Sequence, residues 1–340
     1  MTQSSRASIC SKSSKQRVNE MRVEFTEAVN ELKRAEDVLI LCHRNPDGDT
    51  LGCGYALLRA LKKMGKRAKL KCNDNIPEKF SYLYEGISGE DFEERFIVSV
   101  DVAERKLLGE SFNEAYGDRV DLSFDHHGTA KLFARKTYCE SESASACEII
   151  YNVINALGVE ISGDIASCLY TGMSTDTGCF RYSNVTPRTH RIAAELIEKG
   201  ADHSRINVKM FETKSMNNIM LERMCLDSLE SYAEGKIAVI TVTKAMLDEC
   251  KTDKSALDAI KPVTRQIEGV EIGLTVKQED NGKTGVSVRT SENYDASLIC
   301  AHFGGGGHAR AAGCEMALSP EETKDRIIKY ILEEVVSSKG

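Results

Sequence analysis

The sequence predicts an α/β protein in which a mostly parallel, doubly wound sheet domain is joined by a helical connector to a smaller α/β domain with a mixed sheet. Three observations predict this. Short apolar runs alternate with helical patterns in the first half of the 340 residues, strand signals are absent from about 190 to 230, and strand-like runs with a hairpin turn signal follow. A chain of this length fits two domains. We expect a flexible tail at 1–18, a first domain at 19–190, a connector at 191–232 and a second domain at 233–340.

The apolar runs of the first domain are typical of buried strands in a parallel sheet. Residues 38–42 are apolar throughout, as in a strand that is covered on both faces. Apolar residues at helical spacing predict a helix over 50–64, and Gly65 is its expected end. Further strands are expected at 68–72, 96–100 and 120–124.

The second half of the chain changes character after the connector. Residues 192–199 form a helical pattern that ends at Gly200, and 237–242 resemble a strand. The pair Asn281-Gly282, between apolar stretches at 270–276 and 286–289, is typical of a hairpin turn. A capping box with proline at the first helical position, Ser319-Pro320-Glu321-Glu322, predicts a helix that runs to 336.

Composition excludes several classes of protein. Lys and Arg number 45 and Asp and Glu 52, which gives a net charge of −7, so the chain lacks the basic surface that holds long nucleic acids. No apolar run reaches the roughly 18 residues that predict a membrane-spanning helix. The 12 cysteines include no C-x-x-C pair, and residues 1–16 lack the apolar segment of a secretory signal. We therefore expect a cytoplasmic protein with free thiols.

Acidic and histidine side chains follow three of the expected strands, at the point where each strand ends. The three segments are 43–49 (HRNPDGD), Asp101, and 125–127 (DHH). Because the carboxyl ends of parallel strands meet at one edge of a sheet, where such sheets bind ligands, we expect these side chains to lie close together. Carboxylates at close range repel one another unless a cation neutralises them. Carboxylate and imidazole donors suit Mn²⁺ or Mg²⁺, so the sequence predicts a metal site.

Asp176 is a further candidate ligand. It follows Ile165 and Leu169 at helical spacing, which places its carboxylate on the apolar face at the end of a helix. An unpaired carboxylate there would be costly, which favours a metal partner. The alternative is an aspartate in the turn before Gly178. A lone histidine at a strand end is more often structural, but three motifs at corresponding strand ends argue against that interpretation.

A second candidate site is the run FGGGGHARAAG at 303–313. Consecutive glycines let the backbone approach a ligand closely and present N–H groups to an anion. His308 and Arg310 add donors, and Arg289 on a nearby expected strand is another anion-binding candidate. The alternative is a flexible glycine linker, but linkers seldom carry His and Arg in an Ala/Gly context that is typical of a helix start.

Together these motifs resemble those of the DHH phosphoesterase superfamily. The resemblance rests on HRNPDGDTLG at 43–52, Asp101, Asp125-His126-His127 and Asp176, and the run GGGGHARAAG resembles the DHH-associated C-terminal domain. The motifs are similar to those of the oligoribonuclease (nanoRNase) and pAp-phosphatase branch, over about residues 20–335. The resemblance implies a catalytic domain at 19–190 and a substrate-binding domain at 233–340.

The resemblance also implies a role for each residue. One Mn²⁺ would be bound by His43 and Asp47, and a second by Asp49, His126 and Asp176. Asp101 would bridge both ions, and His127 would face the substrate phosphate; Mg²⁺ is the alternative metal. The nucleotide would be held by Arg289, Gly305, Gly306, Gly307, His308 and Arg310. Arg181 would lie near the substrate.

The implied reaction is metal-dependent hydrolysis of short oligoribonucleotides to mononucleotides, with a pAp 3′-phosphatase activity beside it. Two ions ~3.5–4 Å apart would lower the pKa of a water and stabilise displacement at phosphorus. The motifs leave open a phosphodiesterase for pApA or cyclic di-AMP. The glycine-rich segment disfavours a manganese pyrophosphatase, the short acidic chain disfavours a nuclease for long strands, and the complete ligand set disfavours a non-catalytic nucleotide sensor. We expect short RNA or a dinucleotide as partner and no membrane; a homodimer is compatible with the sequence.

Overall fold

Our computed structural model describes residues 21–336, with the exception of 129, 253–259, 261–262 and 280. The chain forms two compact units that divide between Thr213 and Lys214. The expected tail at 1–18 lies outside the described residues. No helix in the described part of the chain has the length and apolar character needed to cross a membrane.

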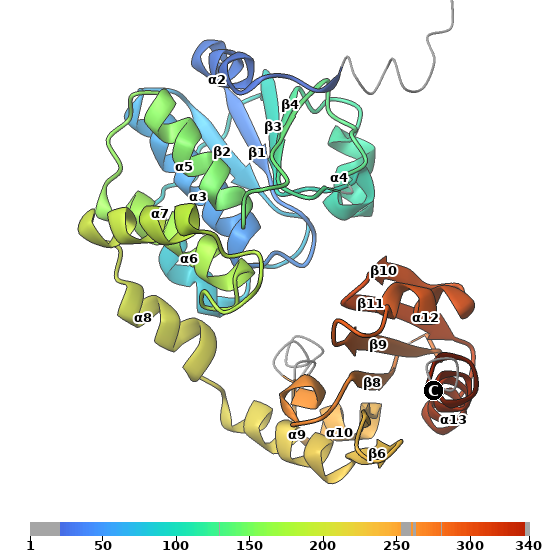
Figure 1. Cartoon of the computed structure of the whole chain (residues 1–340). Coiled ribbons are helices and arrows are strands. Elements are labelled where there is room, and N and C mark those ends of the chain that lie inside the picture. The colour runs from blue at the N-terminus through green and yellow to red at the C-terminus, as the bar shows by residue number, and fades with distance from the viewer. Residues whose placement is uncertain (1–20, 129, 253–259, 261–262, 280, 337–340) are drawn as a thin grey trace, which may run out of the picture. The chain divides into compact units, whose positions relative to one another are not determined.

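A five-stranded, all-parallel sheet forms the centre of the first unit (Figure 1). Its order is β2-β1-β3-β4-β5, and the strands are β1 (Val38–Leu41), β2 (Ala68–Lys71), β3 (Phe96–Val100), β4 (Leu122–Asp125) and β5 (Lys136–Cys139). From β1 the chain crosses to β2 on one side and then to β3 on the other. The order of the strands therefore reverses between β1 and β3, which is where doubly wound sheets open a crevice for ligands.

Helices cover both faces of this sheet, as the apolar runs predict. One face packs against α2, α3, α5 and α6, and the other packs against α4 and a 3₁₀ turn at Arg105–Leu108. Successive residues of β1 point to opposite faces of the sheet, since Ile40 packs in the core beneath the first set of helices and Leu39 packs in the core beneath α4. The helices of this unit are α2 (Phe25–Arg34), α3 (Gly48–Lys63), α4 (Glu110–Tyr116), α5 (Ala146–Ala156), α6 (Gly163–Asp176), α7 (Pro187–Glu198) and α8 (His203–Asn207), with a 3₁₀ turn at Glu78–Leu83 and a π turn at Val208–Glu212.

Glycines allow α3 and α6 to approach each other closely. A Cβ atom at Gly52 would lie 2.5 Å from the carbonyl oxygen of Cys168 in α6. A Cβ atom at Gly172 would lie 2.2 Å from the Sγ atom of Cys147 and 2.7 Å from Oδ1 of Asp49. Real Cβ atoms do not make contacts this short, so these positions require glycine. The close packing fixes the first turn of α3, which carries Asp49, against α6.

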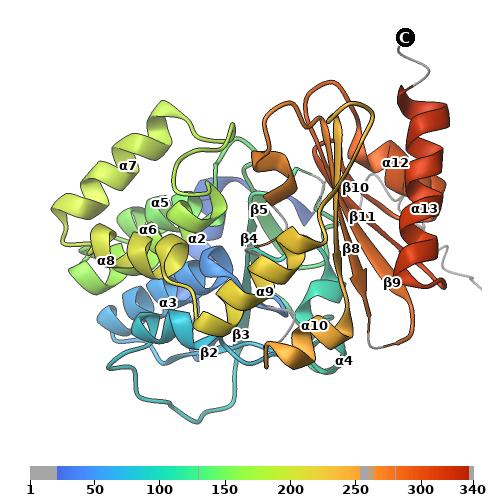
Figure 2. The ribbon, with the colours of Figure 1, turned by 90° about the horizontal axis from the view of Figure 1, so that it is seen from below.

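The second unit is built on a six-stranded mixed sheet of order β10-β11-β9-β8-β7-β6. Only β7 and β8 pair in parallel. Helices α12 and α13 lie on the same side of the sheet (Figure 2), while α9 packs against β7. The elements are α9 (Met216–Asp227), β6 (Glu230–Tyr232), β7 (Ile237–Val242), α10 (Lys244–Glu249), β8 (Ile272–Gln278), β9 (Thr284–Thr290), α12 (Ala296–His302), β10 (Gly306–His308), β11 (Ala311–Met316) and α13 (Pro320–Tyr330), with a 3₁₀ turn at Val263–Gln266.

These two sheets confirm the predicted fold class. The hairpin of β8 and β9 and the capping box of Ser319 and Glu322 are present, although α13 changes to a π turn at Ile331–Val336. Four of these strands were not predicted: β5, β6, β10 and β11. The interpretation of 303–313 as the context of a helix start was wrong, because β10 and β11 form an antiparallel pair there. In β5 only Thr137 is buried, and β6 has no buried residue, so neither shows apolar alternation. Both lie at sheet edges, where less of a strand is covered.

Candidate active site

The ends of three parallel strands bring the predicted ligands together in the first unit. His43 follows β1, Asp101 follows β3 directly, and Asp125 is the last residue of β4, with His126 next to it. Asp47 caps α3, Asp49 lies in its first turn, and Asp176 is the last residue of α6. These residues form groups of three whose donor atoms lie close enough to hold a metal ion.

The first group is His43, Asp47 and Asp101. The Nε2 atom of His43 lies 3.5 Å from Oδ1 of Asp47 and 3.7 Å from Oδ2 of Asp101. On the opposite side of the ring, Nδ1 lies 2.8 Å from the carbonyl oxygen of Arg44. Because a carbonyl can only accept, Nδ1 carries the proton, and the lone pair of neutral His43 is on Nε2, facing the carboxylates.

The second group is Asp49, His126 and Asp176. The Nε2 atom of His126 lies 3.4 Å from Oδ2 of Asp176, 3.8 Å from Oδ2 of Asp49 and 3.6 Å from Oδ1 of Asp101. Its Nδ1 atom donates to the carbonyl oxygen of Ser143 at 3.2 Å. Both histidines therefore use one nitrogen as an anchor and turn the other toward acids, as metal-binding histidines do.

Asp101 lies between the two groups. Oδ2 faces His43 and Oδ1 faces His126, and Oδ1 has no hydrogen-bond partner among the described residues although the side chain is only 4% exposed. Burial, followed by the charges of neighbouring acids that include Asp49 and Asp176, raises the pKa of Asp101 well above its ordinary value. Its φ of +57° is a backbone conformation that costs free energy and is frequent at functional sites. An orphaned, buried carboxylate among other carboxylates fits a bridging ligand of two cations.

The two aspartates at the start of α3 are held by backbone N–H groups. Oδ1 of Asp47 accepts from the N–H groups of Asp49 at 3.0 Å and Thr50 at 3.1 Å, as an N-cap does. Asp49 accepts from Ala146 at 2.7 Å and Cys147 at 3.0 Å, the first residues of α5. Its carboxylate is thus oriented before any cation binds.

Asp125 has a role that the sequence analysis did not assign. Its Oδ1 atom accepts from the backbone N–H groups of His126 at 2.8 Å and His127 at 3.2 Å, and from Nδ1 of His127 at 2.8 Å. Asp125 is buried and orients both histidines, and its hydrogen bond to His127 raises the pKa of that imidazole. The ring of His127 remains 38% exposed, as a group that meets a substrate must be. A sequence signal for this role exists, since an aspartate side chain can accept hydrogen bonds from the backbone N–H groups of the two residues that follow it.

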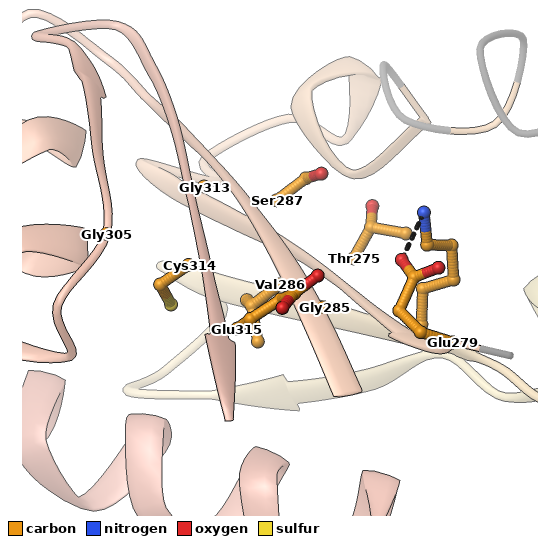
Figure 3. A pocket seen from close by; sticks show the side chains of 10 residues that line it. Thr275, Glu279, Gly285, Val286, Ser287, Gly305, Gly313, Cys314 and Glu315 are labelled. Atoms are coloured by element: carbon orange, nitrogen blue, oxygen red, sulfur yellow. Dashed lines mark ion pairs between the residues drawn. The ribbon is translucent and has the colours of Figure 1, made fainter. Parts of the chain in front are cut away.

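The second unit contains an open sheet face with small side chains. Across β8, β9 and β11, Thr275 pairs with Ser287, and Ser287 pairs with Gly313. This row forms part of the floor of a cavity of about 380 Å³ that Gly305 also lines (Figure 3). In the adjacent row, Arg289 stands between two small residues, Gly273 and Ala311. Of the predicted residues, Gly305 lines this cavity, and Arg289 lies in the next row of the same sheet.

The glycine-rich run packs β10 tightly onto β11. A Cβ atom at Gly305 would lie 2.2 Å from the carbonyl oxygen of Gly313, and one at Gly307 would lie 2.6 Å from Cα of Ala312, whereas Gly306 has open space. Arg310 donates through one guanidinium nitrogen to the carbonyl oxygens of Tyr294, at 2.5 Å, and Ser291. His308 ends β10, and its side chain lies outside the described part of the structure.

Comparison with known protein families matches both units. The model of the DHH family, N-terminal domain, covers residues 37–173, and that of the DHHA1 domain covers 234–337. The chain belongs to the DHH family. This membership confirms the predicted hydrolase of the phosphoesterase class, and the groups of acids and histidines agree with the metal dependence of DHH phosphoesterases.

Individual relatives cover most of this DHH-family chain. It is 27% identical over 305 residues to the bifunctional oligoribonuclease and PAP phosphatase NrnA of Thermus thermophilus. The aligned region covers 88% of this chain and 90% of the relative. Identity to the protein of the same name from Bacillus subtilis is 22%, over 86% of this chain and 93% of the relative. An exopolyphosphatase-related protein from Bacteroides fragilis has the same fold, with a TM-score of 0.81 at 24% identity, over 90% of this chain and 96% of that structure.

Proposed function

We propose that this DHH-family phosphoesterase hydrolyses short oligoribonucleotides to mononucleotides and also removes the 3′-phosphate of pAp. The observation that carries the proposal is the pair of His-acid groups that share Asp101 at the carboxyl edge of the parallel sheet. The names of the Thermus and Bacillus relatives support this substrate class.

Six residues would hold two divalent ions, preferentially Mn²⁺. One ion would take His43, Asp47 and Asp101, and the other would take Asp49, Asp101, His126 and Asp176. When bound, the pair of ions supplies a water of lowered pKa and neutralises charge on the phosphate. Oxygen and imidazole donors of this kind suit Mn²⁺ and Mg²⁺ better than soft metals.

The residues of the chain supply the remaining parts of the mechanism. Asp125 accepts a hydrogen bond from Nδ1 of His127 and raises the pKa of the ring, which favours the protonated imidazolium. In that form Nε2 also carries a proton and can donate to a phosphate oxygen of the substrate. The anchors of His43 and His126 fix which nitrogen of each ring is a ligand. The acids are thereby arranged in advance, which reduces the reorganisation needed during the reaction.

We propose that the open sheet face of the second unit binds the nucleoside end of the substrate. The row of Thr275, Ser287 and Gly313 leaves room above the sheet, and Arg289 in the next row provides a cation for a phosphate or a base edge. Binding through one end needs few phosphate contacts, which is compatible with a net charge of −7.

A product time course tests the proposal. The purified protein with Mn²⁺ is incubated with 5′-labelled RNAs of two, five and twenty-four nucleotides, and in parallel with pAp, pApA, cyclic di-AMP and pyrophosphate. We expect mononucleotides from the two shortest RNAs, phosphate release from pAp, and little cleavage of the longest RNA. The Asp101→Ala variant is the control and should be inactive. Turnover confined to pApA or cyclic di-AMP would assign the protein to dinucleotide degradation instead, and turnover of none of the substrates would contradict the proposal.

A further inference from the structure

The loop between β5 and α5, residues 140–145, is linked to each residue of the second metal group, directly to His126 and through α5 or Asn184 to Asp49 and Asp176. The carbonyl oxygen of Ser143 accepts from Nδ1 of His126 at 3.2 Å. The loop leads into the first N–H groups of α5, which bind the carboxylate of Asp49 at 2.7 and 3.0 Å. One side chain, Asn184, donates to the carbonyl oxygens of both Ala144, at 2.9 Å, and Asp176, at 3.3 Å. A shift of this loop would therefore move the partners of Asp49, His126 and Asp176 together.

An arginine from α7 joins the two ends of the loop. Arg188 lies in the first turn of α7, whose start is fixed by a capping box at Thr186. One of its guanidinium nitrogens pairs with Oε1 of Glu140, where the loop begins, and its Nε atom lies 3.7 Å from Oε2 of Glu148, in the first turn of α5. Glu140 is also held by Tyr138, whose hydroxyl donates to Oε2 at 3.0 Å.

The contact with Glu148 is difficult to replace, because Glu148 is fully buried. A buried carboxylate that loses its cation is strongly destabilising. The planar guanidinium can bind two carboxylates at once through different nitrogens, whereas the ammonium of lysine is a single point of charge. Arg188 is thus suited to hold residues 140 and 148 at a fixed separation, and with them the loop.

We propose that Arg188 is a positioning residue for one of the two metal ions. The ion cluster of Glu140, Arg188 and Glu148 holds the 140–145 loop in the conformation that aligns His126 and Asp49. The inference rests on the two-metal function proposed above. It is specific to the second group, because the anchors of the first group, Arg44 for His43 and the start of α3 for Asp47, do not involve the loop.

Selective loss of one metal affinity is the expected consequence. Loss of the residues that orient metal ligands typically lowers metal affinity by about 10–100-fold. The Arg188→Lys variant keeps a positive charge near Glu148 and so retains the fold, but it no longer bridges both glutamates. We expect one of two Mn²⁺ affinities to fall by about 10–100-fold and the other to stay within about twofold. The kcat at limiting Mn²⁺ should fall, the KM for a dinucleotide should stay unchanged, and excess Mn²⁺ should restore kcat.

Manganese titration of the metal-free protein tests the inference. Free Mn²⁺ is measured by electron paramagnetic resonance for the wild type, Arg188→Lys, Glu140→Gln and the control Arg191→Lys, which changes an exposed arginine of the same helix. Urea unfolding confirms that each variant is folded. We expect Arg188→Lys and Glu140→Gln to weaken the same single site and Arg191→Lys to weaken neither.

The outcomes separate this inference from the function on which it rests. A wild type that binds fewer than two Mn²⁺ per chain would contradict the proposed two-metal site itself. Two wild-type sites that are both unchanged, or both equally weakened, in a folded Arg188→Lys variant would overturn the role of Arg188 and leave the two-metal site standing. If Arg188→Lys fails to fold, Glu140→Gln decides in the same way, since it breaks the cluster at its half-exposed end without leaving Glu148 unpaired.

Discussion

Replacement of Asp101 by asparagine should stabilise the metal-free protein and remove its response to Mn²⁺. The carboxylate is buried, its Oδ1 atom lacks a hydrogen-bond partner in the described structure, and other acids surround it. Asparagine has the same shape and tolerates the φ of +57° as well as aspartate does. The substitution therefore removes charge with little change in geometry.

The size of the effect follows from the distances in the site. Asp101 and Asp176 face the same His126 nitrogen at 3.6 and 3.4 Å. Their oxygens are therefore no more than about 7 Å apart, and two unit charges at that distance repel by about 2.4 kcal/mol at an effective dielectric constant of about 20. The charges of Asp47 and Asp49 repel Asp101 by similar energies, whereas a proton shared among these carboxylates reduces the total repulsion. We expect a net gain of about 1–3 kcal/mol in the free energy of unfolding.

The assay compares urea and thermal unfolding of EDTA-treated wild type and Asp101→Asn at pH 7.5, with and without Mn²⁺. The gain should raise the melting temperature by about 2–4 °C for each kcal/mol in a domain of this size. Since the pKa of folded Asp101 is raised, the folded wild type loses stability as the pH rises from about the ordinary value of 3.8 through that raised pKa. The difference in the free energy of unfolding between Asp101→Asn and the wild type should therefore be largest above this pH range and should vanish below it. Mn²⁺ should stabilise only the wild type.

The control is Asp121→Asn, because Asp121 already has partners in Arg135 and the N–H group of Ile97. That variant should gain no stability in EDTA. An Asp101→Asn variant that is less stable than the metal-free wild type at pH 7.5 would contradict this prediction, as would equal stabilisation of both proteins by Mn²⁺.

Three further predictions follow from the same contacts. Gly172→Ala should cost about 1–3 kcal/mol of stability and weaken Mn²⁺ binding, because the new methyl group meets Asp49; Gly89→Ala, which meets nothing within 4 Å, is its control in urea unfolding. Burial alone would raise the pKa of Glu140, but the ion pair with Arg188 lowers it overall. The ionised Glu140 therefore stabilises the fold above a pH of about 4.5, and this stabilisation is lost as the pH falls through the lowered pKa. Acidification should thus lower the free energy of unfolding more in the wild type than in Glu140→Gln, and an equal pH dependence of the two proteins would contradict this. Arg289→Ala should raise the KM for short RNA and leave hydrolysis of bis-p-nitrophenyl phosphate intact. An equal loss of activity on both substrates would contradict the proposal that the first unit hydrolyses the substrate and the second binds its nucleoside end.

The sequence predicted the fold and the grouping of acids and histidines because both depend on local pattern and topology. Once residues 38–42, 96–100 and 120–124 are identified as parallel strands, the positions of His43, Asp101 and His126 at one sheet edge follow. In the structure, the Nε2 atoms of His43 and His126 lie 3.7 and 3.6 Å from the two carboxylate oxygens of Asp101. Their roles as ligands remain predictions for the manganese measurements.

The supporting contacts could not be predicted in the same way. The segment at 140–145 has the sequence ESESAS, which is typical of any polar loop. Its importance depends on Arg188, which is distant in the sequence and pairs with Glu140 only in the folded chain. The contacts of Arg310 with backbone carbonyls are likewise set by tertiary packing of the second unit, since no spacing in the sequence encodes them.

The central claim, that Asp101 joins two metal sites, is tested most directly by anomalous diffraction from crystals grown with Mn²⁺. We expect two anomalous peaks per chain, ~3.5–4 Å apart, with Asp101 contacting both ions, His43 contacting one and His126 contacting the other. A single peak, or two peaks that do not share Asp101, would contradict it.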